Sequence, residues 1–597
     1  MAVRHQVRYR NGSHRPPAAA PRRDIPRLRV LWLIGVAVVV ATVIWGHLVY
    51  WQVGEHAFLS AAANEQHVKD VQLLATRGVI YDRSGRPLAV DTTVYDVALS
   101  PPQRLSEADE EQVADGLASV LHIQPQQVMK VYRSRAKFAY VAHRVSQTTA
   151  NAIQALHLTN EGVTLQAQPQ RTYLPGGETG DSLGGSFLGF VNYAGQGISG
   201  VEGYYENQLG GRNGTESLYQ DSSGNLLPVT TLQRTDPVQG QSMTLTIDSD
   251  LQYETEQMIQ QAVQQNHART GSVLIMDTKT GGVLAWASAP SYNANNFATT
   301  PRKELTDQAT DPIASTLYEP GSVMKLVTLS GALNSGAITP QTVIDDPGYV
   351  DVDGTTLHDW NGSAWGSVTM RKVLEQSLNV GAVHAQEDEG QANFIHYLHA
   401  FGFGEPTNVG VAGEQSTPLP ARWNPVQLAT AAFGQGIQVN MVQMLAAVNT
   451  IANDGVYVSP HLVQSIGGVP YQGTSREVVS PQTATEMKSM MRSVVQYGEG
   501  RLAEMPAFKY DESGKTGTSQ IPINGSYSDT RFWASFTGFL PSQNPRFSML
   551  VVLDSPNNGS ISGDMGDTAS APVWKRIAQQ VVLQDRVTPE DLPQEPS

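Results

Sequence analysis

The sequence predicts an α+β protein of several domains with a single N-terminal transmembrane helix. Three observations support this prediction. The chain has 597 residues, enough for at least two domains with substantial cores. An uncharged apolar run occupies residues 30–53. After it, a polar and glycine-rich stretch precedes a region, residues 244–584, in which helical and strand patterns alternate.

Residues 1–29 form a basic tail, whereas the rest of the chain is acidic. The tail holds eight arginines and one acid, Asp24. Of the chain's 40 basic and 55 acidic side chains, 32 and 54 therefore lie outside the tail, a balance of about −22. A chain with this balance is a poor binder of nucleic acid, so we expect no nucleic-acid partner.

Residues 30–53 predict a membrane anchor. The run has no Asp, Glu, Lys or Arg, and its roughly 24 residues suffice to cross a bilayer as a helix. Trp32, Tyr50 and Trp51 near its ends suit the membrane interface. The arginines before the run predict a cytoplasmic N-terminus and an extracytoplasmic remainder, in the inner or plasma membrane. The alternative is a signal peptide cleaved near the alanines at 61–63, but the run is longer than a usual signal core and that site lies well beyond its end.

The sequence implies no metal and no other cofactor. It has no cysteine, which excludes thiolate metal sites, and it has no His-Glu-x-x-His or EF-hand pattern. A domain of this size outside the cytoplasm does not need disulfides. We therefore expect chemistry that is carried by side chains alone.

Residues 54–243 predict a first, non-catalytic domain. Residues 55–72 favour a helix, and residues 77–89 favour a β-hairpin with a glycine-containing turn. Residues 100–160 are polar and favour short amphipathic helices. The glycine-rich stretch 175–211 contains few long apolar runs, so we expect loops and short strands there.

Residues 244–584 predict a second domain with one large core. Asp248 or Ser249 can cap a helix that runs to about residue 267. Two strands, 272–277 and 283–287, follow around a turn. The domain closes with strands at 533–539 and 547–553 and with a helix from about residue 572. Residues 585–597 form a polar tail.

Ser322 and Lys325 predict a nucleophile and its base. Pro320-Gly321 is a turn signal before an apolar helical run, so Ser322 and Lys325 share one face of a helix start. A serine hydroxyl needs a base to become a nucleophile, and a desolvated lysine can be that base. The same spacing recurs at Ser134 and Lys137, in a charged stretch that favours a solvated face. The motif alone therefore decides little.

Two further elements follow Ser322 in a fixed order. Ser377-Leu-Asn379 lies where an apolar helix gives way to a loop, and Lys515-Thr-Gly-Thr518 leads towards the closing strands. Ser-x-x-Lys, Ser-x-Asn and Lys-Thr-Gly form a known signature of acyl-transferring serine sites. A second Lys-Thr-Gly, at Lys279, precedes Ser322 and favours a hairpin turn. Only the set that starts at Ser322 has the required order, so this set predicts catalysis.

The first four residues of the set have predicted roles in bond making. Ser322 attacks a carbonyl, and Lys325 accepts its proton. Ser377 and Asn379 relay a proton to the leaving amine and orient Lys325 and the substrate amide.

Lys515 completes the predicted catalytic set, and Thr516, Gly517 and Thr518 have predicted roles in substrate binding. Lys515 attracts a carboxylate, and the hydroxyls of Thr516 and Thr518 can bind it. Gly517 belongs to the same substrate-binding strand. Backbone N–H groups of Ser322 and Thr518 would form the oxyanion hole.

With these motifs, the chain resembles the class B penicillin-binding proteins, which are peptidoglycan DD-transpeptidases. The resemblance extends from the anchor to about residue 583. Three segments resemble motifs of the family's pedestal domain, at 77–85, 171–175 and 200–206. Residues 270–292 resemble the strands that open its transpeptidase domain.

The resemblance implies a fold and a reaction. It implies an elongated, β-rich pedestal of the dimerisation type over 54–243. Over 244–584 it implies a transpeptidase domain, an antiparallel sheet flanked by helices as in serine β-lactamases. The implied donor is a stem peptide ending in D-Ala-D-Ala, which acylates Ser322 with loss of the terminal D-Ala. An amine of a neighbouring stem then resolves the acyl-enzyme, and β-lactams would acylate the same serine.

The role in wall synthesis is open between several alternatives. Residues 318–322, 401–404 and 434–437 resemble the septal, cell-division branch, although the Gln-Ser-Thr-Pro that follows Glu414 departs from its pattern. An elongation enzyme, a DD-carboxypeptidase and a catalytically silent divisome scaffold are the alternatives. No segment resembles a glycosyltransferase, so the resemblance implies a SEDS-type membrane glycan polymerase and other divisome membrane proteins as partners.

Overall fold

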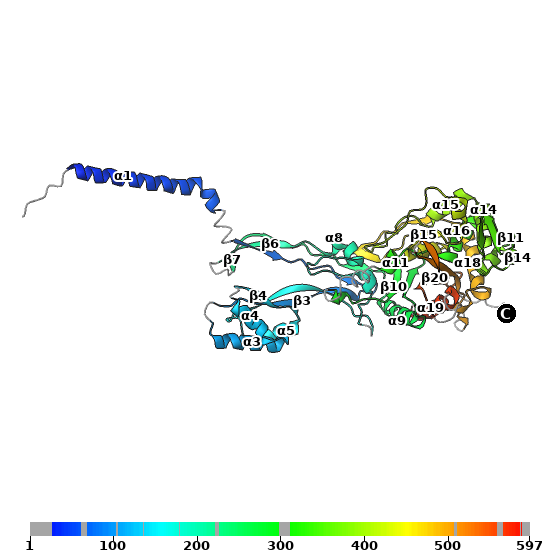
Figure 1. Cartoon of the computed structure of the whole chain (residues 1–597), viewed down its shortest axis with the longest axis horizontal. Coiled ribbons are helices and arrows are strands. Elements are labelled where there is room, and N and C mark those ends of the chain that lie inside the picture. Colours follow the sequence, from blue (N-terminus) through cyan, green and yellow to red (C-terminus); the bar gives the residue numbers. More distant parts are fainter. Residues whose placement is uncertain are drawn as a thin grey trace, which may run out of the picture. The chain divides into compact units, whose positions relative to one another are not determined.

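The computed structural model describes residues 27–60, 68–102, 105–134, 137–177, 180–220, 226–297, 311–506, 510–523, 525–557, 565–584 and 587, with only the backbone given for parts of 220–231. Most of the basic tail, the alanines at 61–63 and the end of the polar tail lie outside these ranges. The chain divides into two units, one comprising the residues up to Leu73 with Gly214–Asp236 and the other Leu74–Asn213 with the residues from Pro237 onward. Figure 1 labels the elements of both.

The first unit begins with the predicted apolar helix. α1 (Arg27–Val49) continues into a π-helical turn at Tyr50–Gly54. Among the described residues, Leu28–Gly54 is the helical segment that is long and apolar enough to cross a membrane. This finding confirms the predicted apolar helix of spanning length.

A three-stranded antiparallel sheet completes the first unit, in the order β1-β6-β7. Its strands are β1 (Val68–Leu73), β6 (Gly214–Gln220) and β7 (Leu226–Thr235). The predicted helix over 55–72 is wrong from Val68 onward, because these residues pair with β6 and Val68 lies opposite Tyr219. A strand partner so distant along the chain leaves no local signal in the sequence.

The second unit opens with a seven-stranded sheet, in the order β17-β16-β8-β2-β3-β4, with β5 paired to β3. Its strands are β2 (Ile80–Tyr81), β3 (Pro87–Leu99), β4 (Ala139–Val145), β5 (Val163–Tyr173), β8 (Met243–Leu245), β16 (Val463–Ile466) and β17 (Val469–Pro470). β2 and β3 confirm the predicted hairpin. β8 lies across the predicted domain boundary at 243/244, and that boundary stays a prediction.

Three helices pack on one end of this sheet: α3 (Glu107–Leu121), α4 (Pro125–Arg133) and α5 (Gln147–Gln154). They confirm the short helices predicted within 100–160. Their apolar faces form a small core with β3 and β5, in which Val97, Leu117 and Val128 are fully buried.

The glycine-rich stretch contains short helices rather than the predicted loops and short strands. These are α6 (Gly185–Leu188), α7 (Gly200–Tyr204) and α8 (Glu206–Leu209). Gly184 and Gly189 bracket α6 with positive φ angles of 67° and 77°, which other residues rarely adopt. The helices form because Phe187 and Val201 are buried against the rest of the unit.

A buried ion cluster joins the three segments that resemble pedestal motifs. Glu202 of α7 is fully buried and accepts hydrogen bonds from Arg77 and Arg171, both at 2.6 Å. Arg77 also contacts Glu206 at 2.6 Å, and Arg171 contacts Asp91 at 3.2 Å. The cluster therefore holds residues from before β2, from β5 and from α7 together.

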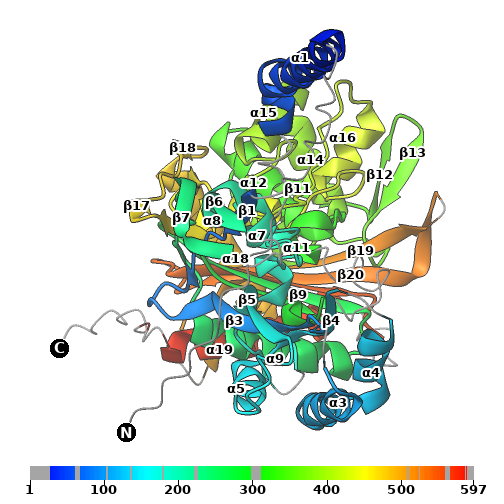
Figure 2. The same cartoon turned by 90° about the vertical axis from the view of Figure 1, so that its left-hand side faces the viewer.

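The region that carries the predicted catalytic residues is built on a five-stranded antiparallel sheet, in the order β10-β9-β21-β20-β19. Its strands are β9 (Thr270–Asp277), β10 (Val283–Ala289), β19 (Ser513–Ile523), β20 (Ser526–Leu540) and β21 (Phe547–Asp554). α9 (Ser249–Gln265) and α19 (Ala571–Gln584) cover one face. Asp248 caps α9 as predicted, accepting hydrogen bonds from the backbone of Asp250 and Leu251. Figure 2 shows both helices on one side of the sheet, with α12 and α14 on the other.

The second face carries a helical lobe. Its helices are α11 (Pro312–Ser315), α12 (Lys325–Asn334), α13 (Met370–Glu375), α14 (Asn379–Glu389), α15 (Gln391–Ala400), α16 (Pro425–Ala432), α17 (Met441–Ala452) and α18 (Pro481–Tyr497). Three strand pairs lie at its margins: β11 (Val343–Asp346) with β14 (Gly366–Thr369), β12 (Tyr349–Val352) with β13 (Thr355–His358), and β15 (Val456–Val458) with β18 (Ser475–Glu477). The sheet and this lobe together match the predicted arrangement of an antiparallel sheet flanked by helices.

Candidate active site

Ser322 lies at a helix start, as the sequence predicted. A short 3-10 turn, Gly321–Met324, leads into α12. Gly321 has φ +55° and packs against Gly434, where an added Cβ would lie 2.1 Å from the Gly321 carbonyl oxygen. The preceding Glu319 accepts hydrogen bonds from the Gly436 N–H at 3.0 Å and from the Tyr527 hydroxyl at 3.1 Å. These contacts fix the backbone that presents Ser322.

Lys325 lies fully buried behind Ser322. Its Nζ is 3.2 Å from Ser322 Oγ, and it donates to the Ser377 carbonyl at 2.5 Å and to Asn379 Oδ1 at 2.8 Å. Both of the latter oxygens can only accept. A neutral amine has two hydrogens and one lone pair, so these two bonds leave the lone pair for the hydrogen of the Ser322 hydroxyl.

The surroundings favour this neutral form. Burial lowers the pKa of Lys325 to about 7, with the nearby Lys515 charge as the second cause. The carboxylates of Glu499, Asp359 and Asp346 act in the opposite direction. At neutral pH Lys325 can therefore act as a general base.

Ser377 lies in the turn between α13 and α14, with a left-handed φ of +58°. Both its carbonyl and its hydroxyl face Lys325, the hydroxyl at 3.4 Å. The predicted transition from helix to loop is correct for Ser377, but Asn379 already opens the next helix. The buried Asp359 accepts hydrogen bonds from the backbone N–H groups of Asn379 and Val380 and so caps that helix.

Lys515 lies on β19, the edge strand of the sheet, and is fully buried. Its Nζ donates to Ser377 Oγ at 2.9 Å, to the Thr516 carbonyl at 3.1 Å and to Thr516 Oγ1 at 3.0 Å. Glu499 lies 3.6 Å from the same Nζ. Burial lowers the pKa of Lys515, and Glu499 is the largest influence that raises it.

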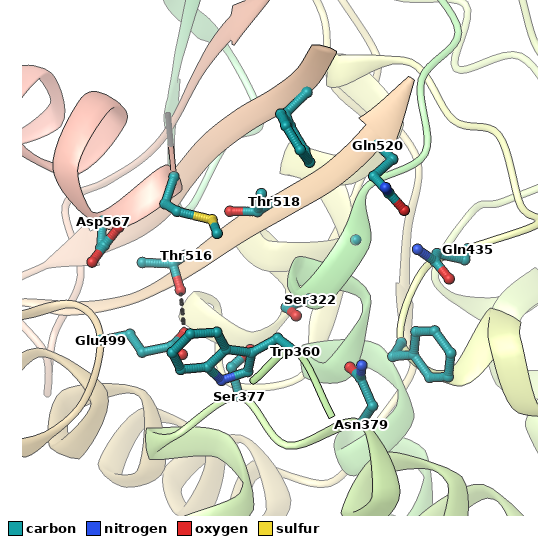
Figure 3. A pocket seen from close by; sticks show the side chains of 14 residues that line it. Ser322, Trp360, Ser377, Asn379, Gln435, Glu499, Thr516, Thr518, Gln520 and Asp567 are labelled. Carbon is teal, nitrogen blue, oxygen red and sulfur yellow. Dashed lines mark hydrogen bonds between the residues drawn. The ribbon is translucent and has the colours of Figure 1, made fainter. Parts of the chain in front are cut away.

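A cavity of about 410 Å³ opens in front of these residues (Figure 3). Five predicted site residues line it: Ser322, Ser377, Asn379, Thr516 and Thr518. Lys325 and Lys515 lie behind this lining. Gly517 does not line the cavity; an added Cβ there would meet Ser535 Oγ at 2.3 Å and Val323 at 2.8 Å, so its role is to let β19 approach the helix start.

The cavity also contains residues that the sequence analysis missed. Glu499 and Asp567 place two carboxylates at one side, and Trp360, with 58% of its surface exposed, covers another. Trp360 Nε1 donates to the Gln376 carbonyl at 3.2 Å. Glu499 and Trp360 lie in loops and Asp567 in a π-helical turn, Gly566–Ser570, and none of them belongs to a recognised spacing. The Asp359-Trp360 pair shortly before Ser377 is nevertheless a composition signal that could have drawn attention.

The two decoy motifs lie away from this cavity. Lys279 occupies the turn between β9 and β10 and pairs with Asp454 at 3.0 Å, which confirms the predicted hairpin turn. Ser134 follows α4 in the other part of the unit, and residues 135–136 of that motif lie outside the described ranges.

Comparison with known families gives two matches. Residues 271–579 match the model of the penicillin-binding protein transpeptidase domain. Residues 72–245 match that of the penicillin-binding protein dimerisation domain. Together the two matches cover most of the described chain.

Individual relatives agree with these matches. Penicillin-binding protein PbpB of Mycolicibacterium smegmatis is 32% identical over 82% of this chain and 75% of its own length. Peptidoglycan D,D-transpeptidase FtsI of Escherichia coli is 30% identical over 94% of this chain and 93% of its own length. The crystal structure of penicillin-binding protein 3 from Mycobacterium tuberculosis in complex with aztreonam superposes with a TM-score of 0.65 at 26% identity, over 87% of this chain and 98% of the other.

Proposed function

The chain belongs to the class B penicillin-binding proteins, a family of peptidoglycan D,D-transpeptidases, and we propose here the residues by which it works. It is a serine enzyme of cell-wall synthesis that forms an acyl-enzyme and binds β-lactams. It is a membrane-anchored protein with one N-terminal apolar helix.

In the proposed acylation step, Ser322 is the nucleophile and Lys325 the base. Ser322 Oγ attacks the carbonyl carbon between the two D-Ala residues while its proton passes to Lys325. The C–N bond then breaks, and the proton moves through the Ser377 hydroxyl to the nitrogen of the departing D-Ala. The N–H groups of Ser322 and Thr518 stabilise the oxyanion, and losing one such donor typically costs about 10²–10³ in rate.

The second step releases the product. An amine of a neighbouring stem attacks the Ser322 ester and gives its proton to Lys325 as the new amide bond forms. Ser322 then recovers its hydroxyl hydrogen. A β-lactam follows only the first step, since its amide nitrogen stays tethered to the acyl group and blocks the acceptor.

The strand β19 binds the donor in this proposal. Lys515 supplies positive charge for the terminal carboxylate, and the hydroxyls of Thr516 and Thr518 face the cavity where that carboxylate would lie. Gly517 permits the close approach of β19 to Val323 that sets this geometry.

One observation supports the proposal most strongly: the Lys325 amine is surrounded by two obligate acceptors and the Ser322 hydroxyl. The test is covalent labelling by a fluorescent penicillin. We expect an adduct on the wild type and none on Ser322→Ala. Ser134→Ala, which alters the decoy motif, is the matched control and should label normally. An adduct on Ser322→Ala would exclude Ser322 as the nucleophile.

Product analysis separates transpeptidation from the alternatives. Incubation with stem pentapeptides and an acceptor amine should yield cross-linked dimers with release of D-Ala. Tetrapeptides without dimers would indicate a DD-carboxypeptidase. Absence of both products and of any adduct would indicate a silent scaffold.

We place this activity in septal wall synthesis. Residues 318–322, 401–404 and 434–437, which resemble the septal branch, support this role, as does similarity to FtsI. Depletion of the protein should give filaments or failed septa. Rounded cells would instead indicate an elongation enzyme.

The location and partners follow from the same reasoning. The eight arginines before the anchor support a cytoplasmic N-terminus and an extracytoplasmic catalytic domain in the plasma or inner membrane. Protease added outside intact spheroplasts should then digest the catalytic domain. A SEDS-type glycan polymerase and other divisome membrane proteins are the proposed partners, to be tested by co-purification from detergent extracts.

The domain boundaries are also proposals. A pedestal over 54–243 and a transpeptidase domain over 244–584 are supported by the family matches at 72–245 and 271–579. Residues 1–29 form the cytoplasmic tail, 30–53 the anchor and 585–597 a polar C-terminal tail.

A further inference from the structure

We propose that Glu499 is a positioning residue of this active site. It fixes the direction of a hydrogen-bond chain that runs through Thr516, Lys515 and Ser377. It thereby keeps the one proton that the two buried lysines would share on Lys515 rather than on Lys325. The inference rests on the proposed function, because it assigns Lys325 the role of base. It concerns a carboxylate that belongs to none of the three catalytic motifs.

Glu499 is held in place by its backbone. It follows α18 between Gly498 and Gly500, and its N–H donates to the carbonyl of Glu375 at 3.1 Å. An added Cβ on Gly498 would lie 2.3 Å from that carbonyl oxygen, so this approach requires glycine. The Glu499 side chain, 24% exposed, points into the cavity beside Thr516 (Figure 3).

The hydrogen bonds around Lys515 have a definite direction. The Thr516 hydroxyl is 3.0 Å from Glu499 Oε2, and an ionised carboxylate can only accept, so Thr516 is the donor. The Thr516 oxygen must then accept from Lys515 Nζ, which lies 3.0 Å away. The Thr516 carbonyl is a second obligate acceptor for Lys515, at 3.1 Å.

The third Lys515 bond reaches Ser377. An ammonium has three hydrogens, and the third donates to Ser377 Oγ at 2.9 Å. Ser377 therefore keeps its own hydrogen free for the leaving nitrogen, while its oxygen lies 3.4 Å from Lys325 Nζ. Glu499 thus orients a chain that ends at the atoms where protons move in the reaction.

Without Glu499 the chain loses its direction. Either the Thr516 hydroxyl or the Ser377 hydroxyl could then turn and donate to the single lone pair of a neutral Lys515. The proton would then be free to move to Lys325, which would lose its lone pair and cease to be a base. Two buried lysines that are linked through one hydroxyl titrate as a coupled pair. A nearby charge that acts more strongly on one of them determines which lysine holds the proton.

The charges around the two lysines support Glu499 as that external charge. Among the described residues the acids that act on Lys515 are Glu499 and Asp567, and only Glu499 lies within 4 Å of its Nζ, at 3.6 Å. Glu499 also acts on Lys325, more strongly than Asp359 and Asp346 do, but it lies more than 4 Å from that amine. The arrangement therefore favours a charged Lys515 beside a neutral Lys325.

The test compares pH profiles of acylation by a fluorescent penicillin, using the full-length protein in detergent. In wild type, the second-order rate constant should rise as Lys325 loses its proton and fall when Lys515 does. In Glu499→Gln, which keeps the size but removes the charge, the alkaline limb should move to lower pH by about one unit or more. Glu499→Asp, which keeps the charge, should move it less. Glu477→Gln, an exposed glutamate on β18, is the matched control and should leave the profile unchanged.

A double-mutant cycle tests the path through Thr516. Thr516→Val removes the bridging hydroxyl and should shift the alkaline limb in the same direction, whatever it does to the height of the profile. Adding Glu499→Gln should then shift the limb less than it does in wild type, because both changes break one chain. If Glu499→Gln does not fold, Thr516→Val still tests the chain.

Two results would overturn the inference: an unchanged alkaline limb in Glu499→Gln, or additive shifts in the cycle. These differ from failure of the proposed function, which would appear as an unlabelled wild type or a labelled Ser322→Ala.

Discussion

At the scale of single residues, Lys325 derives its chemistry from its surroundings. A lysine in water is charged at neutral pH and has no lone pair to offer. Full burial disfavours the charged form of Lys325, and the positive charge of the nearby Lys515 disfavours it further. Lys325 can therefore be neutral and offer its lone pair. Lys325 binds fewer protons in the folded enzyme than in the unfolded chain, so its basic form is available above its lowered pKa and lost below it.

The lowered pKa of Lys325 gives a prediction for the acid side of the pH profile of acylation. With a Lys325 pKa of about 7, acylation by penicillin should level off just above that value and fall again only when Lys515 loses its proton. It should fall about tenfold for each pH unit below the Lys325 pKa, as the neutral fraction falls. Lys325→Arg, whose guanidinium stays charged, should not be acylated at any pH. A rate that stays constant from pH 5 to about 7 would show that Lys325 is not the base.

The sequence identified the site residues that recur in motifs and missed those placed by distant contacts. Ser322, Ser377 and Lys515 could be found because their order along the chain is a signature. Glu499 could not, since its position depends on a backbone hydrogen bond to Glu375 and on two glycines, and a lone glutamate in a loop resembles many others. The predicted roles of the individual residues stay predictions until the labelling experiments are done.

At the scale of elements, the start of α14 depends on a distant cap. Asp359 accepts hydrogen bonds from the N–H groups of Asn379 and Val380, which lie in the first turn. Asp359→Ala should lower the free energy of unfolding by about 1 kcal/mol and slow acylation, because Asn379 then loses its fixed orientation towards Lys325. Thermal melting and penicillin labelling measure the two effects. Asp351→Ala, an exposed aspartate on β12, should change neither.

The loop after α16 gives a second prediction at this scale. Gly434 and Gly436 both have positive φ angles, +82° and +73°, so alanine strains the backbone similarly at each. Only at Gly434 would the new Cβ meet the backbone of Gly321, at 2.1 Å. Gly434→Ala should therefore displace Ser322 and slow acylation about a hundredfold, because small misplacements are that costly. Gly436→Ala should label nearly as wild type; equal losses in both variants would point to strain alone.

The elements that the sequence predicted well are those with local signals. The helix capped by Asp248, the hairpin of β9 and β10 and the closing strands β20 and β21 follow from caps, turns and alternating apolar residues. The strand β1 was missed because its partner β6 lies far along the chain. The short helices around Phe187 were missed because their burial, not their glycine-rich composition, determines them.

At the scale of the whole molecule, the Arg77–Glu202–Arg171 cluster joins the non-catalytic and catalytic parts of the second unit. α7, which carries Glu202, begins at Gly200, whose backbone pairs with Ala412 of the catalytic region. The helix that carries the central carboxylate of the cluster is therefore in backbone contact with that region. The cluster is fully desolvated at Glu202, so its charges depend on one another.

The prediction concerns the removal of one charge from this cluster. Glu202→Gln leaves two buried guanidinium groups without their shared partner and should lower the free energy of unfolding by about 3–5 kcal/mol. Glu206→Gln is the matched control, since Glu206 also lies 2.6 Å from Arg77 but its side chain is 35% exposed. It should destabilise the protein less. Thermal melting measures both, and equal losses would argue against a special role for the buried position.

The strand order of the central sheet has a consequence for how the protein is made. β21, the last strand in sequence among the described residues, lies between β9 and β20, and β20 in turn pairs with β19, the strand that carries Lys515. A nascent chain that ends before Phe547 therefore lacks the strand that would bring its two halves into register. Catalytic competence should thus appear only after β21 has been synthesised, and β-lactams should not react with a chain that ends before it.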